Sequence, residues 1–178
     1  MTTISPDTIA VAQNITLLVL DVDGVLSDGK LYFSAQGDEL KIFNILDGLG
    51  IKMLMSQGVE VGIITGRNSP VVARRARDLG IEHLLQGRED KREALSELTT
   101  KLGISLAHTA YVGDDLPDLG AIVSAGLGIT VPNAHSFVRQ HADHCTQTRG
   151  GEGAVREVCD LILAAKGKLD GMLNDYLP

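Results

Sequence analysis

Aromatic residues and cysteines are scarce in this chain of 178 residues. It has no tryptophan and only three phenylalanines and three tyrosines, so its core must consist mainly of leucine, isoleucine, valine and alanine. So few aromatics give no sign of a base-stacking surface for nucleic acid. The two cysteines, Cys145 and Cys159, form no CxxC pair and indicate no disulfide framework.

Long apolar runs and an excess of positive charge are also missing. The net charge of −7 argues against a nucleic-acid partner but leaves room for a small anionic ligand. No stretch approaches the roughly 20 apolar residues that span a bilayer. The first residues show no basic region before an apolar run, so we expect no signal peptide, no membrane partner and a cytoplasmic protein.

What the sequence does contain is an alternation of short apolar runs with helical patterns. Helices are expected over 70–79, where Ser69 can cap the start and Gly80 closes the end, and over 90–102, 117–125 and 153–166. Such alternation predicts a single α/β domain over 1–178, Rossmann-like, with a parallel sheet covered by helices on both faces. The expected strands are 15–20, 58–65, 81–86, 108–113, 127–131 and a sixth at 142–146.

Residues 29–43, GKLYFSAQGDELKIF, break this alternation. Two extended halves flank a turn at 35–38, which predicts a β-hairpin inserted after the first strand. The C-terminal segment, 149–178, opens on RGGEG. This loop precedes a helix, so it could cradle an anion with backbone N–H groups or could be a flexible turn.

Polar side chains gather where the predicted strands end. In parallel sheets, ligands bind outside the carboxyl ends of the strands, so these groups should converge at one edge. A single Asp there is more often a turn or cap residue, and DxDG alone could suggest a calcium loop, but the convergence favours a functional site. The groups are Asp21 and Asp23, Thr65-Gly66-Arg67, Lys91, and Asp114 with Asp115.

The chemistry that suits these groups is phosphoryl transfer. Clustered carboxylates repel unless a cation lies among them, and Mg²⁺ prefers carboxylates, waters and phosphate oxygens. One carboxylate can attack phosphorus to form an aspartyl-phosphate, and another can protonate the leaving oxygen and later activate water. A hydroxyl and a lysine can stabilise the transferring group.

DVDGV at 21–25, ITGR at 64–67, Lys91 and GDDLPD at 113–118 together resemble the haloacid dehalogenase-like phosphohydrolases. The order and spacing match all four motifs of that superfamily. The resemblance implies that Asp21 is the nucleophile and Asp23 the general acid/base. It also implies that Thr65 and Lys91 contact the phosphate.

The same resemblance implies a Mg²⁺ site. Its ligands would be Asp21, Asp114 and the backbone carbonyl of Asp23, with Asp115 and Asp118 supporting from nearby.

Four longer stretches are similar to one family within this superfamily, the phosphatases of 3-deoxy-D-manno-octulosonate 8-phosphate, which act in lipopolysaccharide synthesis. They are FNILDGLGIKML (43–54), GREDK (87–91), AYVGDDLPDL (110–119) and RGGEGAVREVCDLIL (149–163). Many members have an arginine where this chain has Leu46, which removes a possible partner for the sugar carboxylate. The residues implied at or near the substrate are Asp23, Asn44, Asp47, Gly48, Lys52, Arg67, Arg75 and Lys91.

Superfamily members usually carry a cap domain after the first or second motif, and the spacing here leaves no room for one. A capless site would be open to water, so we expect a neighbouring subunit to cover it. The resemblance implies a homotetramer, with the hairpin at a central interface and the C-terminal segment over an adjacent site. Two other functions remain open, a phosphatase of a nonulosonate 9-phosphate and a phospho-accepting receiver-like module.

Overall fold

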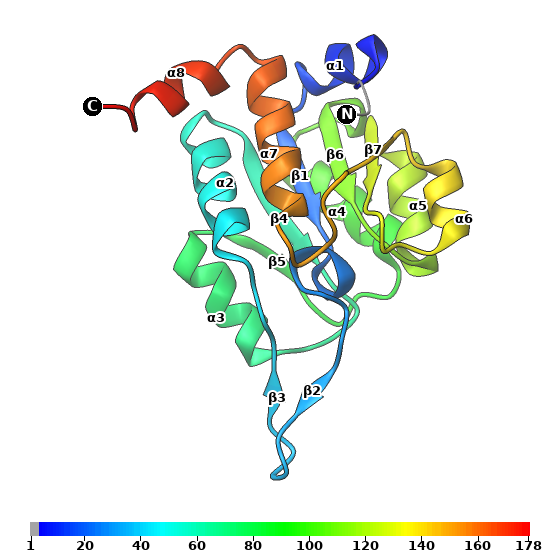
Figure 1. Ribbon diagram of the computed structural model, residues 1–178. Coiled ribbons are helices and arrows are strands. Elements are labelled where there is room, and N and C mark those ends of the chain that lie inside the picture. Colours follow the sequence, from blue (N-terminus) through cyan, green and yellow to red (C-terminus); the bar gives the residue numbers. More distant parts are fainter. Residues whose placement is uncertain (1–3) are drawn as a thin grey trace.

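Six parallel strands form the central sheet of the computed structural model, which describes residues 4–178 (Figure 1). Their order is β5-β4-β1-β6-β7-β8, so the first strand of the chain lies in the interior of the sheet. The strands predicted from the sequence are all present, each shorter than its apolar run. They are β1 (Leu17–Leu20), β4 (Glu60–Ile64), β5 (His83–Leu85), β6 (Thr109–Val112), β7 (Leu127–Thr130) and β8 (His144–Cys145).

Two hydrophobic clusters lie on opposite faces of this sheet, as the alternation of side chains along a strand requires. Leu18 and Leu20 of β1 join one cluster, and Leu17 and Val19 join the other. The first cluster is covered by α1 (Pro6–Ala12), α2 (Ile45–Ser56), α3 (Pro70–Leu79) and α7 (Ala154–Ala165). The second is covered by α4 (Lys91–Leu102), α5 (Leu116–Ser124) and α6 (Ser136–His141).

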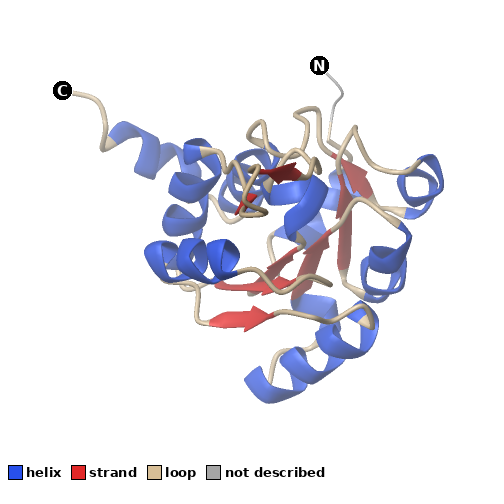
Figure 2. Ribbon diagram, turned by 90° about the horizontal axis from the view of Figure 1, so that it is seen from below, coloured by secondary structure: helices blue, strands red, loops and turns tan. Residues whose placement is uncertain are grey.

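Seen from below, the strands lie between these two groups of helices (Figure 2). The predicted Rossmann-like α/β fold is therefore confirmed. The helix α8 (Leu169–Asn174) follows α7 and extends beyond the sheet (Figure 1). No helix within residues 4–178 is long and apolar enough to cross a bilayer.

The ends of α3 show where local signals succeed and where one fails. Gly80 ends the helix in the left-handed conformation with φ 79°, as expected for a glycine at this position. Ser69 occupies the N-cap position, but its side chain does not cap the helix. Its Oγ instead donates a hydrogen bond of 2.8 Å to Glu39 Oε2, because Glu39 of the hairpin lies against this helix start.

The predicted hairpin consists of β2 (Tyr32–Phe33) and β3 (Glu39–Leu40), paired antiparallel. It projects from the body of the domain as an arm (Figure 1). Its apolar side chains face away from the core, and Leu31, Phe33, Leu40 and Ile42 are 55% to 60% exposed. These four residues form what we call the hairpin patch.

Candidate active site

The groups that follow β1, β4, β5 and β6 meet at the carboxyl edge of the sheet. They surround a cleft of about 430 Å³, and no inserted domain lies over it in residues 4–178. The convergence expected from the sequence is therefore observed. The residues lining the cleft are Asp21, Asp23, Gly29, Thr65, Gly66, Arg67, Glu89, Lys91, Asp114, Asp115, Pro117 and Asp118.

The turn after β1 holds the first two carboxylates. Asp21 N–H continues the ladder to Val112 of β6, and the chain then makes one wide turn over Val22–Leu26. Gly24 in this turn has φ 94°, a conformation that favours glycine. A Cβ there would lie 1.9 Å from Asp114 Oδ2, so the Asp114 carboxylate lies directly against the turn.

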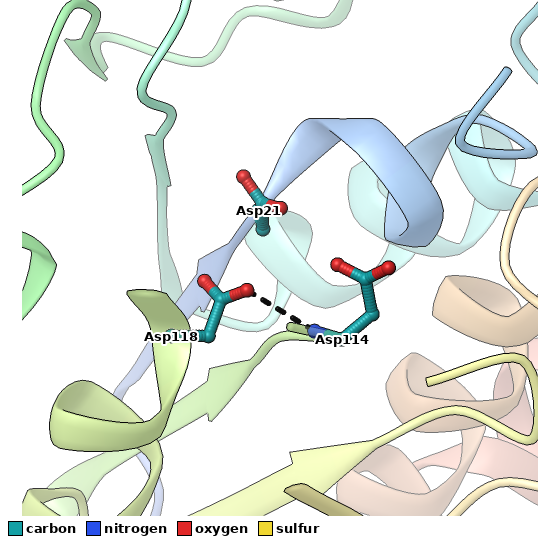
Figure 3. Close-up of side chains that lie close together, drawn as sticks. All are labelled: Asp21, Asp114 and Asp118. Atoms are coloured by element: carbon teal, nitrogen blue, oxygen red, sulfur yellow. Dashed lines mark hydrogen bonds between the residues drawn. The ribbon is translucent and has the colours of Figure 1, made fainter. Parts of the chain in front are cut away.

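Asp21, Asp114 and Asp118 form a carboxylate cluster in which one oxygen from each lies within 4.8 Å of the others (Figure 3). Asp118 already has partners for both oxygens. Its Oδ2 accepts the backbone N–H groups of Asp114 and Asp115 at 3.2 Å, and its Oδ1 accepts from Lys91 and Tyr111. Asp118 is therefore suited to support the cluster, and Asp21 and Asp114 keep oxygens for a ligand.

Lys91 begins α4 and points into this cluster. Its Nζ lies 2.8 Å from Asp21 Oδ1 and 2.7 Å from Asp118 Oδ1, and the side chain is 6% exposed. Three carboxylates and one ammonium leave two negative charges within the cluster. A divalent cation would balance them, so the donor set fits Mg²⁺.

The pKa values of these groups reflect the same charge imbalance. Burial, followed by the charge of Asp118, raises the pKa of Asp21 to about 7. Burial and Asp118 likewise raise the pKa of Asp114 to about 7. Burial lowers the pKa of Lys91, but the charges of Asp21 and Asp118 outweigh it and raise the pKa overall.

Asp23 lines the cleft and is contacted by a residue that the sequence did not single out. Lys41, which follows β3, donates a hydrogen bond to Asp23 Oδ1. Arg67 Nε lies 3.9 Å from Asp23 Oδ2. Thr65, after β4, lines the same cleft and is 2% exposed.

Tyr111 and Asn133 are two further residues that the sequence analysis missed. Tyr111 Oη donates a hydrogen bond of 2.8 Å to Asp118 beneath the cluster. A tyrosine inside a fully buried strand needs such a partner, and that signal was present in the sequence. Asn133 Nδ2 donates to Gly24 O at 2.9 Å, a long-range contact with no sequence signal.

The RGGEG loop packs against the turn that holds Asp21 and Asp23. Gly151 N–H donates to Val25 O at 2.9 Å, and Gly150 N–H donates to Asn133 Oδ1 at 2.8 Å. These two backbone donors are thus engaged by protein acceptors. Of the two alternatives for this loop, the structure favours a supporting turn over an anion cradle.

Residues expected near the substrate from α2 and α3 lie outside the cleft lining of residues 4–178. Asn44 caps α2, and Lys52 is exposed. Arg75 donates a hydrogen bond to Asn44 O at 3.3 Å and lies against Gly48, where a Cβ would be 2.5 Å from its Nη2. Of the expected sugar contacts, the cleft itself brings together Asp23, Arg67 and Lys91.

Asp47 is buried between α2 and α7, with 1% of its surface exposed. Its Oδ1 accepts the backbone N–H of Arg156 at 2.8 Å, in the first turn of α7. Since α7 follows Gly153, which has no capping side chain, Asp47 supplies the cap from another helix.

Comparisons with known proteins show which enzymes this chain is similar to. The sequence model of the haloacid dehalogenase-like hydrolase family matches residues 82–158. The 3-deoxy-D-manno-octulosonate 8-phosphate phosphatase of Escherichia coli K12 is 52% identical over 167 residues, which are 94% of this chain and 89% of that protein. The phosphatase of the same name from Yersinia pestis is 48% identical over 94% of this chain and 90% of that protein.

Solved structures show the same fold. The 3-deoxy-D-manno-octulosonate 8-phosphate phosphatase of Moraxella catarrhalis, crystallised in complex with a magnesium ion, a phosphate ion and a KDO molecule, superposes with a TM-score of 0.94 at 49% identity, covering 96% of this chain and 98% of that one. The cobalt-bound phosphatase from Haemophilus influenzae superposes with a TM-score of 0.88 at 41% identity, covering 92% and 99%.

Proposed function

This chain belongs to the haloacid dehalogenase-like hydrolases, and we propose that it is the Mg²⁺-dependent phosphatase that hydrolyses 3-deoxy-D-manno-octulosonate 8-phosphate to the free sugar acid and phosphate, a step in lipopolysaccharide biosynthesis. The observation that carries the proposal is the carboxylate cluster of Asp21, Asp114 and Asp118 around Lys91, in a chain whose whole fold matches that of a Mg²⁺-bound phosphatase. Identity near 50% over nearly the whole chain supports the same substrate.

Asp21 is the nucleophile in this proposal. Its oxygen attacks phosphorus to form an aspartyl-phosphate, and Asp23 protonates the departing sugar oxygen. Asp23 then accepts a proton from the water that attacks the aspartyl-phosphate, which releases phosphate and restores Asp21. The position of both residues on one turn at the cleft supports this division of roles.

Asp21, Asp114 and the backbone carbonyl of Asp23 would hold Mg²⁺. When bound, the ion neutralises the negative charge on the phosphate and the carboxylates. Asp118 keeps Lys91 and the backbone of Asp114 in place beneath it. Asp115 caps α5, where it accepts the N–H of Leu116 at 2.8 Å.

The phosphate would be contacted by Thr65 and Lys91, both of which line the cleft. Arg67 would meet the sugar acid, and its position in the cleft lining with 44% of its side chain exposed supports this role. The remaining sugar contacts, from α2 and α3, are proposed from the resemblance, and Leu46 stands where many relatives have an arginine. They are Asn44, Gly48, Lys52 and Arg75, while Asp47, whose buried carboxylate caps α7, would support them from behind.

The enzyme would act as a homotetramer in the cytoplasm. The hairpin patch supports an assembly, because four apolar side chains that are more than half exposed on one arm are suited to an interface. In the tetramer the hairpins would meet centrally, and the C-terminal segment would lie over a neighbouring cleft. Two free thiols, at Cys145 and Cys159, suit a reducing compartment.

A substrate panel tests the proposed function. Phosphate release is measured from 3-deoxy-D-manno-octulosonate 8-phosphate, a nonulosonate 9-phosphate and unrelated sugar phosphates, each with Mg²⁺ and with EDTA. We expect the highest kcat/KM on the first compound and loss of turnover in EDTA. A higher kcat/KM on the nonulosonate would reassign the substrate. A stable phosphoprotein without turnover would instead indicate a receiver-like module.

A further inference from the structure

Lys41 is buried against the side chain of Asp23 and has no role in the reaction described above. It contacts Asp23 Oδ1, and its Nζ lies 3.5 Å from Glu39 Oε1. Only 3% of the lysine side chain is exposed. An ammonium group buried between two carboxylates is held in place by both, so this contact fixes one oxygen of Asp23.

The second carboxylate oxygen of Asp23, Oδ2, is not held by a comparable contact. Arg67 Nε is 3.9 Å from Oδ2, which is too long for a hydrogen bond. The guanidinium donates instead to Glu39 Oε1 at 2.7 Å. Within residues 4–178, Asp23 Oδ2 therefore accepts no hydrogen bond, although Asp23 lines the cleft.

Glu39 connects this arrangement to the hairpin. It accepts hydrogen bonds from Arg67 and from Ser69, and it belongs to β3, which ends just before Lys41. The base of the hairpin is thereby tied to the loop after β4 and to the start of α3. These contacts fix the part of the chain that carries Lys41, and a residue that positions another must itself be held in place.

We propose that Lys41 is a positioning residue of the phosphatase: by holding Asp23 Oδ1, it turns Oδ2 toward the scissile bond. This inference rests on the proposed function. In the first step the bond between Asp21 and phosphorus forms, the bond from phosphorus to the sugar oxygen breaks, and the proton on Oδ2 moves to that oxygen. In the second step Oδ2 takes a proton from water as the water oxygen bonds to phosphorus and the Asp21 bond breaks. Lys41 keeps its proton throughout.

The dependence on the leaving group tests this role. A sugar alkoxide needs a proton to depart, whereas p-nitrophenolate leaves without one. We expect Lys41→Met to lower kcat/KM for the sugar phosphate by about 10- to 100-fold, mostly through kcat, because general acid catalysis contributes roughly 10²- to 10⁴-fold. For p-nitrophenyl phosphate the fall in kcat/KM, which reports the first step, should be less than about threefold, and this retained kcat/KM shows that the variant is folded.

A double-mutant cycle locates the effect on Asp23. In an Asp23→Asn background, Lys41→Met should cause no further loss with the sugar phosphate, because both changes remove the same proton transfer. Lys30→Met is the matched control, since Lys30 lies at the start of the hairpin segment, is 71% exposed and pairs with Asp28 rather than Asp23. Lys30→Met should leave kcat/KM unchanged on both substrates.

The proposal would be overturned if Lys41→Met lowered kcat/KM equally on the two substrates or on neither of them. It would also be overturned if the losses in the double-mutant cycle were additive. If Lys41→Met does not fold, Lys41→Gln, which keeps a polar end group, takes its place. The same difference is then expected between its losses of kcat/KM on the sugar phosphate and on p-nitrophenyl phosphate. Wild-type enzyme that is active on p-nitrophenyl phosphate and glycerol phosphate, but not on the sugar acid phosphate, would refute the proposed substrate alone. The leaving-group comparison then uses glycerol phosphate, and inactivity on every phosphate would refute both.

Discussion

Asp47 should make the stability of this protein fall as the pH rises, and asparagine should remove that dependence. The carboxyl is buried, and its Oδ1 caps α7 through the N–H of Arg156. Its Oδ2 is buried without a hydrogen-bond partner in residues 4–178. Burial outweighs the hydrogen bonds to Arg156 and Val155 and raises the pKa of Asp47 to about 6.

The direction in which stability changes with pH follows from this raised pKa. The folded state binds the proton more tightly than the unfolded state, so the stabilisation by the protonated carboxyl is lost as the pH rises from the unfolded pKa to the folded one. A rise from 3.8 to about 6 corresponds to about 3 kcal/mol at roughly 1.4 kcal/mol per unit. About 2 kcal/mol of this falls between pH ~4 and ~7.5, because at the lower value the unfolded carboxyl is already half ionised.

The assay is urea unfolding of wild type and Asp47→Asn at those two pH values and one protein concentration. Asparagine keeps the Oδ1 acceptor and carries no titratable proton, so its cost is the same at both pH values. The stability of the variant relative to wild type should therefore rise by about 2 kcal/mol from the lower to the higher pH. Asp170→Asn, at an exposed aspartate in the first turn of α8, should parallel wild type. The reasoning would be refuted if the difference in unfolding free energy between Asp47→Asn and wild type were the same at both pH values.

Three further predictions concern the site and its supports. Because Asp21 and Asp114 have pKa values of about 7, protons compete with Mg²⁺ for these carboxylates. The apparent Mg²⁺ affinity measured by calorimetry should therefore rise by about tenfold or more from pH ~6 to ~8. An affinity independent of pH would contradict this. Gly150→Ala places a Cβ 1.7 Å from Gly24 O and must shift the Asp21 turn, so kcat/KM should fall by about a hundredfold. Gly171→Ala, where no described atom lies within 4 Å of the added Cβ, should leave kcat/KM unchanged, and equal effects of the two alanines would be inconsistent with our account. Phe33→Glu with Leu40→Glu should lower the mass measured by light scattering, while Val123→Glu, at an exposed valine on α5, should not; a tetramer in both variants would exclude the hairpin patch as its interface.

The sequence was sufficient for the sheet, because its strands are apolar runs bounded by turns and its polar groups follow the strand ends. Asp21, Thr65, Lys91 and Asp114 could be placed together for that reason alone. The same local signals failed at Ser69, whose hydroxyl meets Glu39 rather than its own helix. A cap is predicted from neighbours in sequence, and here the competing partner is 30 residues away.

Long-range contacts account for most of what the sequence could not reveal. Lys41 is 18 residues from Asp23, and the hairpin pattern predicts its strands without predicting how its base docks. Asn133 reaches the Asp21 turn across 109 residues. Asp47 looked like a polar residue of a binding motif, and only the packing of α2 on α7 shows that its carboxylate caps a helix.

The most direct measurement of the central claim is the mass of Asp23→Asn protein quenched in acid after mixing with Mg²⁺ and p-nitrophenyl phosphate. This leaving group needs no proton, and the variant lacks the base that activates water, so the phosphorylated enzyme should accumulate. Our account predicts a burst of p-nitrophenol close to one equivalent and a phosphoryl group on the peptide that contains Asp21. Rapid turnover with no phosphorylated protein, or a phosphoryl group on any other residue, would contradict it.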